Sequence, residues 1–327
     1  MKINMLVTGG CGFIGSNFIR YELEKYNSVN IVNLDKLTYA GNLENLLDIP
    51  KDYKDRYAFV KGDILDAELV KQIIAENRID IIINFAAESH VDRSIIEPAE
   101  FMKTNILGVQ TLLEAVKQAG IERFIQISTD EVYGDLPDKG YFREETSLAP
   151  NSPYAASKAS ADMLVKAYFH TYKLPVIITR CSNNYGPYQF PEKLIPLMIT
   201  NALQSKTLPI YGDGTNVRDW IHVIDHSRAV DLVLQKGETG EIYNIGSDNE
   251  RTNIDVAKFV LKRLGKPETL IKFVKDRLGH DRRYAINADK IKKALGWKPV
   301  YDFEDGLKQT ISWYVDNRAW WKSITEL

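Results

Sequence analysis

Residues 3–15 read INMLVTGGCGFIG, an apolar strand-like run that ends in closely spaced glycines. Gly9, Gly12 and Gly15 stand at spacing three. Because glycine has no Cβ, such a turn can be tight, can approach a pyrophosphate closely and can pack the next helix against a sheet. The N-terminus of that helix would direct free N–H groups toward a phosphate. A glycine triplet alone also fits a purely structural turn, so its context has to decide.

Short β-branched runs alternate with helical stretches after this turn. Strands are predicted at 3–7, 30–34, 57–61, 79–85, 123–128 and 176–180, and helices at 15–24, 68–77, 99–119 and 154–172. Alternation of this kind, with strands that are apolar throughout, indicates a parallel sheet covered on both faces. With right-handed crossovers the fold class is α/β, a doubly wound, Rossmann-like parallel sheet.

The alternation loosens after Asn183, where proline and glycine become frequent. Beyond it we predict a helix at 194–205, a strand–helix–strand unit at 220–223, 227–235 and 241–245, helices at 254–264 and 289–295, and a packed C-terminal helix around Trp313, Tyr314, Trp320 and Trp321. We therefore expect a smaller, interleaved C-terminal substrate domain. The first domain would comprise residues 1–185 and about 219–250, the second about 186–218 and 251–327.

Composition narrows the class of protein. The chain of 327 residues is 44% hydrophobic and 26% charged, typical of a globular protein, and its net charge of −2 predicts no nucleic-acid partner. No stretch approaches the ~18 apolar residues of a membrane span, and the opening run is too short for a signal peptide. Cys11 and Cys181 have no metal or disulfide spacing. We expect a cytoplasmic protein with reduced thiols, no metal and no membrane association.

Acidic residues end the second and third predicted strands. Asp35, twenty residues after Gly15, is placed to bind both hydroxyls of a ribose and to repel a 2′-phosphate, which favours NAD over NADP. Lys36, directly after Asp35, is the one residue that argues against this preference for NAD. Asp63 ends the third strand and fits either a cofactor contact or the N-cap of the next helix.

The fourth strand ends in Ala86-Ala87, which is small enough for a cofactor to lie flat on it. Four consecutive strand ends thus carry plausible cofactor contacts. Ligands of such sheets bind at the carboxyl edge. This agreement has more weight than any single motif.

The fifth strand runs into the sequence STDEVYG, residues 128–134, and a helix follows from Tyr154. Thr129, Asp130 and Glu131 would lie on the cofactor edge, although adjacent acids are more often a solvated strand end. Tyr154 and Lys158 share one helix face at i and i+4, where the ammonium would lower the tyrosine pKa and favour a phenolate base. A chance pairing of an aromatic and a lysine is the alternative.

These residues resemble the extended branch of the short-chain dehydrogenase/reductase family over nearly the whole chain. The Thr129-Asp130-Glu131 triplet sharpens the resemblance to its nucleotide-sugar 4,6-dehydratases. The resemblance implies NAD as cofactor and dTDP-glucose as substrate. Implied cofactor contacts are Gly9, Gly12, Phe13, Ile14, Gly15, Asp35, Lys36, Thr38, Asp63, Ile64, Ala86, Ala87, Thr104, Tyr154, Lys158 and Asn184. Implied substrate contacts are Ser89, His90, Thr129, Asn183, Lys193, Leu194, Pro209, Tyr211, Arg218, Asn253, Arg277 and His280.

The resemblance also implies catalytic roles for Thr129, Asp130, Glu131, Tyr154 and Lys158. Tyr154, supported by Lys158, takes the proton of the sugar 4-hydroxyl, to which Thr129 hydrogen-bonds, while NAD⁺ takes the C4 hydride. Glu131 removes the C5 proton, protonated Asp130 releases the 6-hydroxyl as water, and hydride returns to C6. Asp130 must then be neutral, which burial beside Glu131 would favour.

Three alternatives remain open at the level of sequence. An epimerase or decarboxylase acting on a UDP-sugar would share the fold and the tyrosine–lysine pair but would lack the Asp-Glu pair. A non-catalytic NAD-binding protein would not need the chemical residues. Thymidine and uridine differ by one methyl group, worth only ~1 kcal/mol of burial. By resemblance we also expect a homodimer through a four-helix bundle of helices 99–119 and 154–172, and a role in L-rhamnose supply for polysaccharide.

Overall fold

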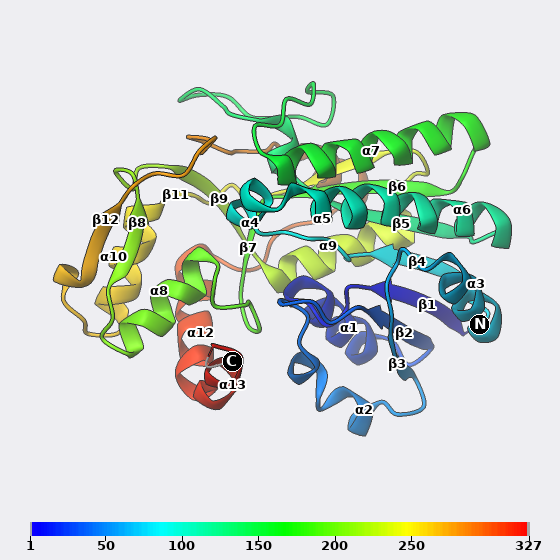
Figure 1. Cartoon of the computed structure of the whole chain (residues 1–327), viewed down its shortest axis with the longest axis horizontal. Helices are drawn as coiled ribbons and strands as arrows, with labels where there is room; N and C mark the ends of the chain where they lie inside the picture. Colours follow the sequence, from blue (N-terminus) through cyan, green and yellow to red (C-terminus); the bar gives the residue numbers. More distant parts are fainter. Residues whose placement is uncertain (1, 326–327) are drawn as a thin grey trace.

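A parallel sheet of seven strands dominates residues 2–325, the part of the chain that the computed structural model describes (Figure 1). Its strand order is β3-β2-β1-β4-β5-β6-β10, and the order reverses between β1 and β4. This is the switch point of a doubly wound fold, so the predicted fold class is confirmed. The strands are β1 (Ile3–Thr8), β2 (Val29–Asp35), β3 (Tyr57–Lys61), β4 (Ile81–Asn84), β5 (Arg123–Thr129), β6 (Val176–Cys181) and β10 (Ile242–Ile245).

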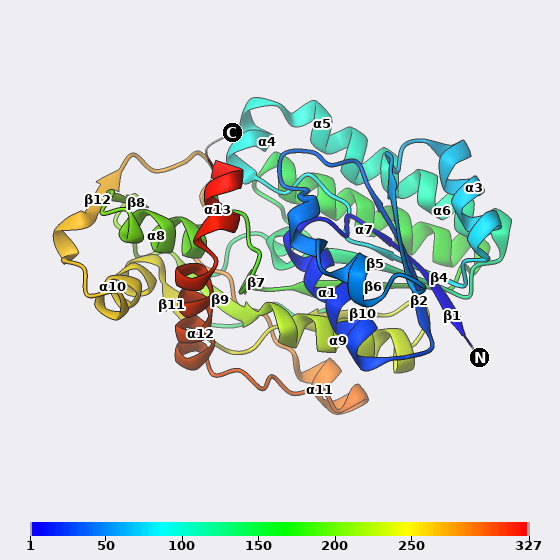
Figure 2. The ribbon, with the colours of Figure 1, turned by 90° about the horizontal axis from the view of Figure 1, so that it is seen from below.

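Helices cover both faces of this sheet (Figures 1 and 2). On one face α1 packs on α9, and on the other α6 lies between α3 and α7. Phe18, Ile19 and Leu23 of α1 are buried in the first of these layers, because apolar side chains on one helix face must be removed from water. The helices are α1 (Phe13–Lys25), α3 (Ala67–Asn77), α6 (Val109–Ala119), α7 (Pro153–Tyr172) and α9 (Val223–Lys236).

The helix predicted over 99–119 is wrong as a single α-helix. It consists of α5 (Pro98–Met102), a π-helical segment (Lys103–Gly108) and α6. In the π segment the buried Asn105 amide receives a hydrogen bond from Glu88 N at 2.9 Å and donates to Glu88 O at 3.0 Å and to Ser157 Oγ at 2.8 Å. The local change of helical period accompanies this cross-link between α7 and the end of β4, as π-segments near functional sites often do.

A second group of elements lies beyond the carboxyl edge (Figure 2). It contains a three-stranded sheet of β7 (Asn183–Tyr185), β9 (Val217–His222) and β11 (Glu250–Thr252), and a pair formed by β8 (Leu208–Tyr211) and β12 (Ile271–Val274). Its helices are α8 (Leu194–Leu203), α10 (Asn253–Arg263), α12 (Phe303–Asp316) and α13 (Arg318–Thr325). The short helices α2 (Ile49–Asp52), α4 (Val91–Ile96) and α11 (Asp289–Leu295) complete the set of α-helices within residues 2–325.

Two predictions for this region need correction. The strands predicted at 220–223 and 241–245 belong to different sheets, because β9 pairs with β7 and β11 whereas β10 pairs with β6. The tryptophan-rich end forms two helices, α12 and α13, that share one buried cluster. The domain boundaries stay a prediction, and their ends at Met1 and at residues 326–327 lie outside the described residues. None of the helices within residues 2–325 is long and apolar enough to cross a membrane.

Candidate active site

Two adjoining cavities lie at the carboxyl edge of the large sheet. The first, of about 290 Å³, runs along the ends of β1, β2, β4 and β5, and the second, of about 390 Å³, extends toward β8 and α10. The residues that line both cavities join them: Ser89, Glu131, Asn183, Asn184, Gln189, Glu192 and Lys193. The site therefore has one compartment over the doubly wound sheet and one between the two parts of the molecule.

The glycine turn has the geometry of a phosphate cradle. Gly9 has φ +70°, and a Cβ there would stand 2.5 Å from Ala86 N, so only glycine fits. A Cβ on Gly15 would collide with Gly9 O. Gly12 is the N-cap of α1 and supplies no capping side chain, so the first N–H groups of that helix face the cavity. The turn fits a pyrophosphate bound at a helix N-terminus.

Asp35 is held at the end of β2 by two backbone donors. Cys11 N and Leu37 N each donate to one carboxylate oxygen at 2.8 Å, while burial raises the pKa of Asp35. Lys36 is paired with Asp63, 2.8 Å between Nζ and Oδ2, so its charge is already compensated. Lys36 is therefore a weaker argument against NAD than the sequence alone indicated.

The N-cap alternative for Asp63 is wrong. Asp66 caps α3 by accepting from Leu69 N, while Asp63 accepts from Leu65 N one turn earlier. Asp63 stays in the cavity wall. Every predicted cofactor contact lines the first cavity: Gly9, Gly12, Phe13, Ile14, Gly15, Asp35, Lys36, Thr38, Asp63, Ile64, Ala86, Ala87, Thr104, Tyr154, Lys158 and Asn184.

Thr129, Asp130 and Glu131 form the turn after β5, where a single 3₁₀ turn (Asp130–Tyr133) begins. Thr129 Oγ1 accepts from Glu131 N and donates to Asp130 Oδ1, both at 3.3 Å. Asp130 is 1% exposed. Burial, followed by the charges of Glu131 and Asp219, raises the pKa of Asp130 well above its usual range. This direction favours the neutral carboxyl group, the form that can donate a proton.

Glu131 is in a different electrostatic environment. Burial raises its pKa too, but Arg218, Lys193 and Arg277 oppose this because three cations favour the carboxylate. Among the largest influences on the pKa of its neighbour Asp130, Arg218 is the cation that opposes the rise. Adjacent carboxyl groups whose surroundings push their pKa values apart are suited to act as an acid and a base.

Tyr154 and Lys158 lie on the buried face of α7 and both line the first cavity. The predicted lowering of the tyrosine pKa is wrong for this structure. Burial, and then Glu131, raise the pKa of Tyr154 well above its usual range. Lys158 Nζ donates to Ile127 O at 2.7 Å, and burial lowers the pKa of this lysine. Formation of a phenolate therefore needs additional positive charge.

The second cavity gathers the remaining predicted substrate contacts: His90, Leu194, Pro209, Tyr211, Arg218, Asn253, Arg277 and His280, together with Ser89, Asn183 and Lys193 at the junction. Arg218 is in β9, where Val217–His222 pairs with β7 and β11. Lys193 Nζ donates to Ser89 O at 2.8 Å. Thr129, the last predicted substrate contact, lines the first cavity.

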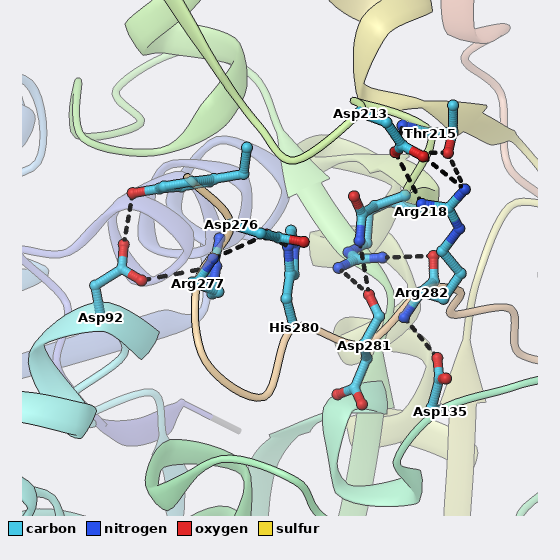
Figure 3. A network of polar contacts seen from close by, with 12 residues as sticks. Asp92, Asp135, Asp213, Thr215, Arg218, Asp276, Arg277, His280, Asp281 and Arg282 are labelled. Atoms are coloured by element: carbon cyan, nitrogen blue, oxygen red, sulfur yellow. Dashed lines mark hydrogen bonds and ion pairs between the residues drawn. The ribbon is translucent and has the colours of Figure 1, made fainter. Parts of the chain in front are cut away.

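A segment after β12 closes this cavity on one side (Figure 3). Arg218 donates to Asp281 O at 2.9 Å, and Arg277 and Tyr211 both approach Asp92, at 3.6 and 3.2 Å. His280 Nδ1 lies 2.6 Å from Asp276 Oδ1. The cationic and aromatic groups are thus positioned around one space, as binding of a nucleotide diphosphate requires.

Among the lining residues of the first cavity that were not predicted are Glu88, Gln189, Phe190 and Glu192. Glu88 follows the fourth strand, so its position at a strand end was the available signal. The others come from the loop before α8, for which the sequence offers no periodicity. Glu192 Oε2 lies 3.5 Å from His90 Nε2, and burial lowers the pKa of His90 to about 4.

Comparison with known proteins agrees with this geometry. A family model described as GDP-mannose 4,6 dehydratase matches residues 6–310. The chain belongs to this dehydratase family. Among its relatives, a dTDP-glucose 4,6-dehydratase of Xanthomonas campestris pv. campestris (strain B100) is 50% identical, with 98% of this chain and 95% of the relative covered.

Two solved structures of dehydratases are also similar. The dTDP-glucose 4,6-dehydratase of Bacillus anthracis str. Ames in complex with NAD has a TM-score of 0.92 and 54% identity, covering 99% of this chain and 100% of that chain. DesIV, a dTDP-glucose 4,6-dehydratase from Streptomyces venezuelae with NAD and TYD bound, has a TM-score of 0.95 and 49% identity over 99% and 100% of the two chains.

Proposed function

We propose that the protein is a NAD-dependent hydro-lyase that converts dTDP-glucose to dTDP-4-keto-6-deoxyglucose and water. The observation that carries this proposal is the pair Asp130–Glu131 in the cavity wall, in which one carboxyl group is buried and the other faces three cations. Similarity to dTDP-glucose 4,6-dehydratases over the whole chain supports the substrate.

The first cavity fits NAD. The Gly9–Gly15 turn and the free N–H groups of α1 would hold the pyrophosphate, and Asp35 would accept hydrogen bonds from a ribose. When bound, NAD supplies the hydride acceptor for C4 of the sugar and the hydride donor for C6. The relatives whose structures are solved with NAD support the same cofactor.

The remaining roles fall to side chains in the cavity wall. Tyr154 accepts the proton of the 4-hydroxyl, with Lys158 and Thr129 beside it. Once C4 is a ketone, the C5 proton is acidic and Glu131 can remove it. Asp130 then donates its proton to the 6-hydroxyl, which leaves as water. These assignments of residues are part of the proposal.

The second cavity would hold the nucleotide. Arg218 and Arg277 are placed for the diphosphate and Tyr211 for stacking on the base. The Asp-Glu pair favours dehydration over a UDP-sugar epimerase or decarboxylase, which needs no acid for a 6-hydroxyl. The presence of Tyr154 and Lys158 in one cavity argues against a non-catalytic NAD-binding protein.

We further propose a homodimer. Met163 and Tyr172 on α7 and Leu107 beside α6 are exposed apolar side chains, 63%, 49% and 49% exposed. The two helices lie side by side on one face (Figure 1), so a second copy could complete a four-helix bundle. Unpaired Cys11 and Cys181 are compatible with the cytoplasm. The product would serve deoxysugar synthesis, such as L-rhamnose for polysaccharide.

Incubation with dTDP-glucose and mass spectrometry of the nucleotide sugar tests the function. A product lighter by one water supports the proposal. A product of unchanged mass whose C4 configuration is inverted by NMR would indicate an epimerase, and an unaltered substrate would refute the dehydratase activity.

A further inference from the structure

Asp219 is a buried carboxylate behind the Asp130–Glu131 turn. It follows Arg218 in β9 and is 1% exposed. Thr129 pairs with Cys181 across β5 and β6, and Asn183 pairs with Trp220 across β7 and β9. Extending the first register forward by one position places Ser182 beside Asp130, and extending the second register back by one position places Ser182 beside Asp219. The junction of the two sheets thus brings the two aspartates together.

The carboxyl oxygens of both aspartates are incompletely paired. Asp219 Oδ1 accepts from Asn249 N at 2.7 Å, whereas Oδ2 has no hydrogen-bond partner within residues 2–325. Asp130 Oδ2 has none among these residues either. A Cβ at Gly246 would lie 2.6 Å from Asp219 Oδ2, so glycine leaves room for this oxygen. In the described chain Asp219 lines neither cavity and is therefore not a substrate contact.

The charged groups around Asp130 and Asp219 are mostly negative, with Arg218 as a nearby cation. Asp130 faces Glu131 on its own turn and Asp219 and Arg218 from β9, with Tyr154 from α7 and Cys181 from β6 also close. Asp219 faces Asp248 and Glu250, which add negative charge, and Ser182. Burial raises the pKa of Asp219 to about 6. Above that pH, a second carboxylate opposes ionisation of Asp130.

We propose that Asp219 is a positioning residue whose negative charge keeps Asp130 in the protonated form that donates to the leaving hydroxyl. The inference rests on the proposed function of Asp130 as the acid. Because Asp219 becomes neutral below about pH 6, its influence is confined to higher pH. A residue that only supported the turn at Asn249 would have no such pH dependence.

Asp219→Asn separates charge from structure, because the amide oxygen can still accept from Asn249 N. The first measurement is the pH titration of the Asp130 carboxyl carbon by NMR of protein labelled at aspartate, assigned by its loss in Asp130→Asn. We expect this titration to move to lower pH in Asp219→Asn. Asp55→Asn, at an exposed position in another part of the chain, should leave it in place.

The second measurement is turnover of dTDP-glucose against pH. Wild type and Asp219→Asn should be equal below about pH 6 and diverge above it, with a loss of roughly tenfold at the alkaline end, less than the ~10²–10⁴-fold contribution of a general acid. An unmoved Asp130 titration, or an equal loss at every pH, would overturn the proposal. If Asp219→Asn does not fold, Asp219→Ser is measured in the same way. If the wild type releases no water from dTDP-glucose, the proposed function fails, whereas the titration still decides the role of Asp219.

Discussion

Lys36 and Asp63 form an ion pair across the rim of the cofactor cavity, with 2.8 Å between Nζ and Oδ2. Because Lys36 is paired, we expect the carboxylate of Asp35 to be the group that discriminates between NAD and NADP at this rim.

Asp35→Ser should therefore reduce discrimination between the two cofactors. It removes the acceptor for the ribose hydroxyls, and hydrogen bonds to a charged group are worth roughly 1.5–3 kcal/mol, so affinity for NAD should fall at least about tenfold. Affinity for NADP should be retained or improve because repulsion of the 2′-phosphate is lost. Binding of each cofactor to cofactor-free protein measures this. Asp55→Ser, at an exposed position, is the control. An unchanged ratio of the affinities for NAD and NADP in Asp35→Ser would refute the proposed role of Asp35.

Lys158→Met should slow turnover by about 10²–10⁴-fold. Burial and Glu131 raise the pKa of Tyr154, so loss of the buried ammonium makes the phenolate still harder to form. The residual rate should consequently rise with pH beyond the range in which the wild type levels off. Steady-state kinetics between pH 6 and about 10 measure this. Lys166→Met, exposed on the same helix, should behave as wild type, and a Lys158→Met enzyme of normal rate would refute the proposed support of Tyr154 by Lys158.

Glu22→Gln should stabilise the protein at high pH. Burial, and then Asp231, raise the pKa of Glu22 to about 9, from an ordinary 4.5. The folded state thus binds a proton that the unfolded state releases above pH 4.5, and stability declines as pH rises toward 9. Glutamine removes this cost, which is on the order of a few kcal/mol near pH 8.

Thermal unfolding should show a higher Tm for Glu22→Gln than for wild type near pH 8, and a difference near zero close to pH 4.5. Glu24→Gln, exposed on the same helix, should show no such pH-dependent gain. A constant difference at all pH values would mean that Glu22 is not a buried neutral acid.

Met163→Glu should dissociate the proposed homodimer, because a charge on an apolar face that a partner covers is costly to bury. Light scattering should give the mass of a dimer for the wild type and of a monomer for the variant. Phe273→Glu changes an equally exposed apolar residue, 60% exposed on β12, and should leave the dimer intact. A monomeric wild type would remove the prediction.

The fold and the cofactor edge were largely predictable because a parallel sheet places all strand ends on one side. Asp35, Ala86 and Asp130 could be brought together by counting strands, without knowledge of side-chain contacts. The interpretation of Tyr154 and Lys158 as neighbours on one helix followed from spacing alone and was also correct.

Other features depend on packing that spacing does not encode. The apolar pattern of 99–119 is the same whether the helix is regular or contains a π segment, so the cross-link through Asn105 was not visible. The sheet to which β9 belongs is set by partners distant in sequence. For the same reason the pairing of Lys158 with Ile127 O and the position of Asp219 behind Asp130 required the structure.

We propose that Asp130 donates the proton that releases water, and Asp130→Asn removes that proton. The amide has nearly the same shape but no acidic proton. We predict that Asp130→Asn converts dTDP-glucose about 10²–10⁴-fold more slowly than wild type, and that a 6-fluoro analogue, whose leaving group needs less protonation, partly restores the rate. A variant that eliminates water from dTDP-glucose at the wild-type rate would show that Asp130 is not the acid.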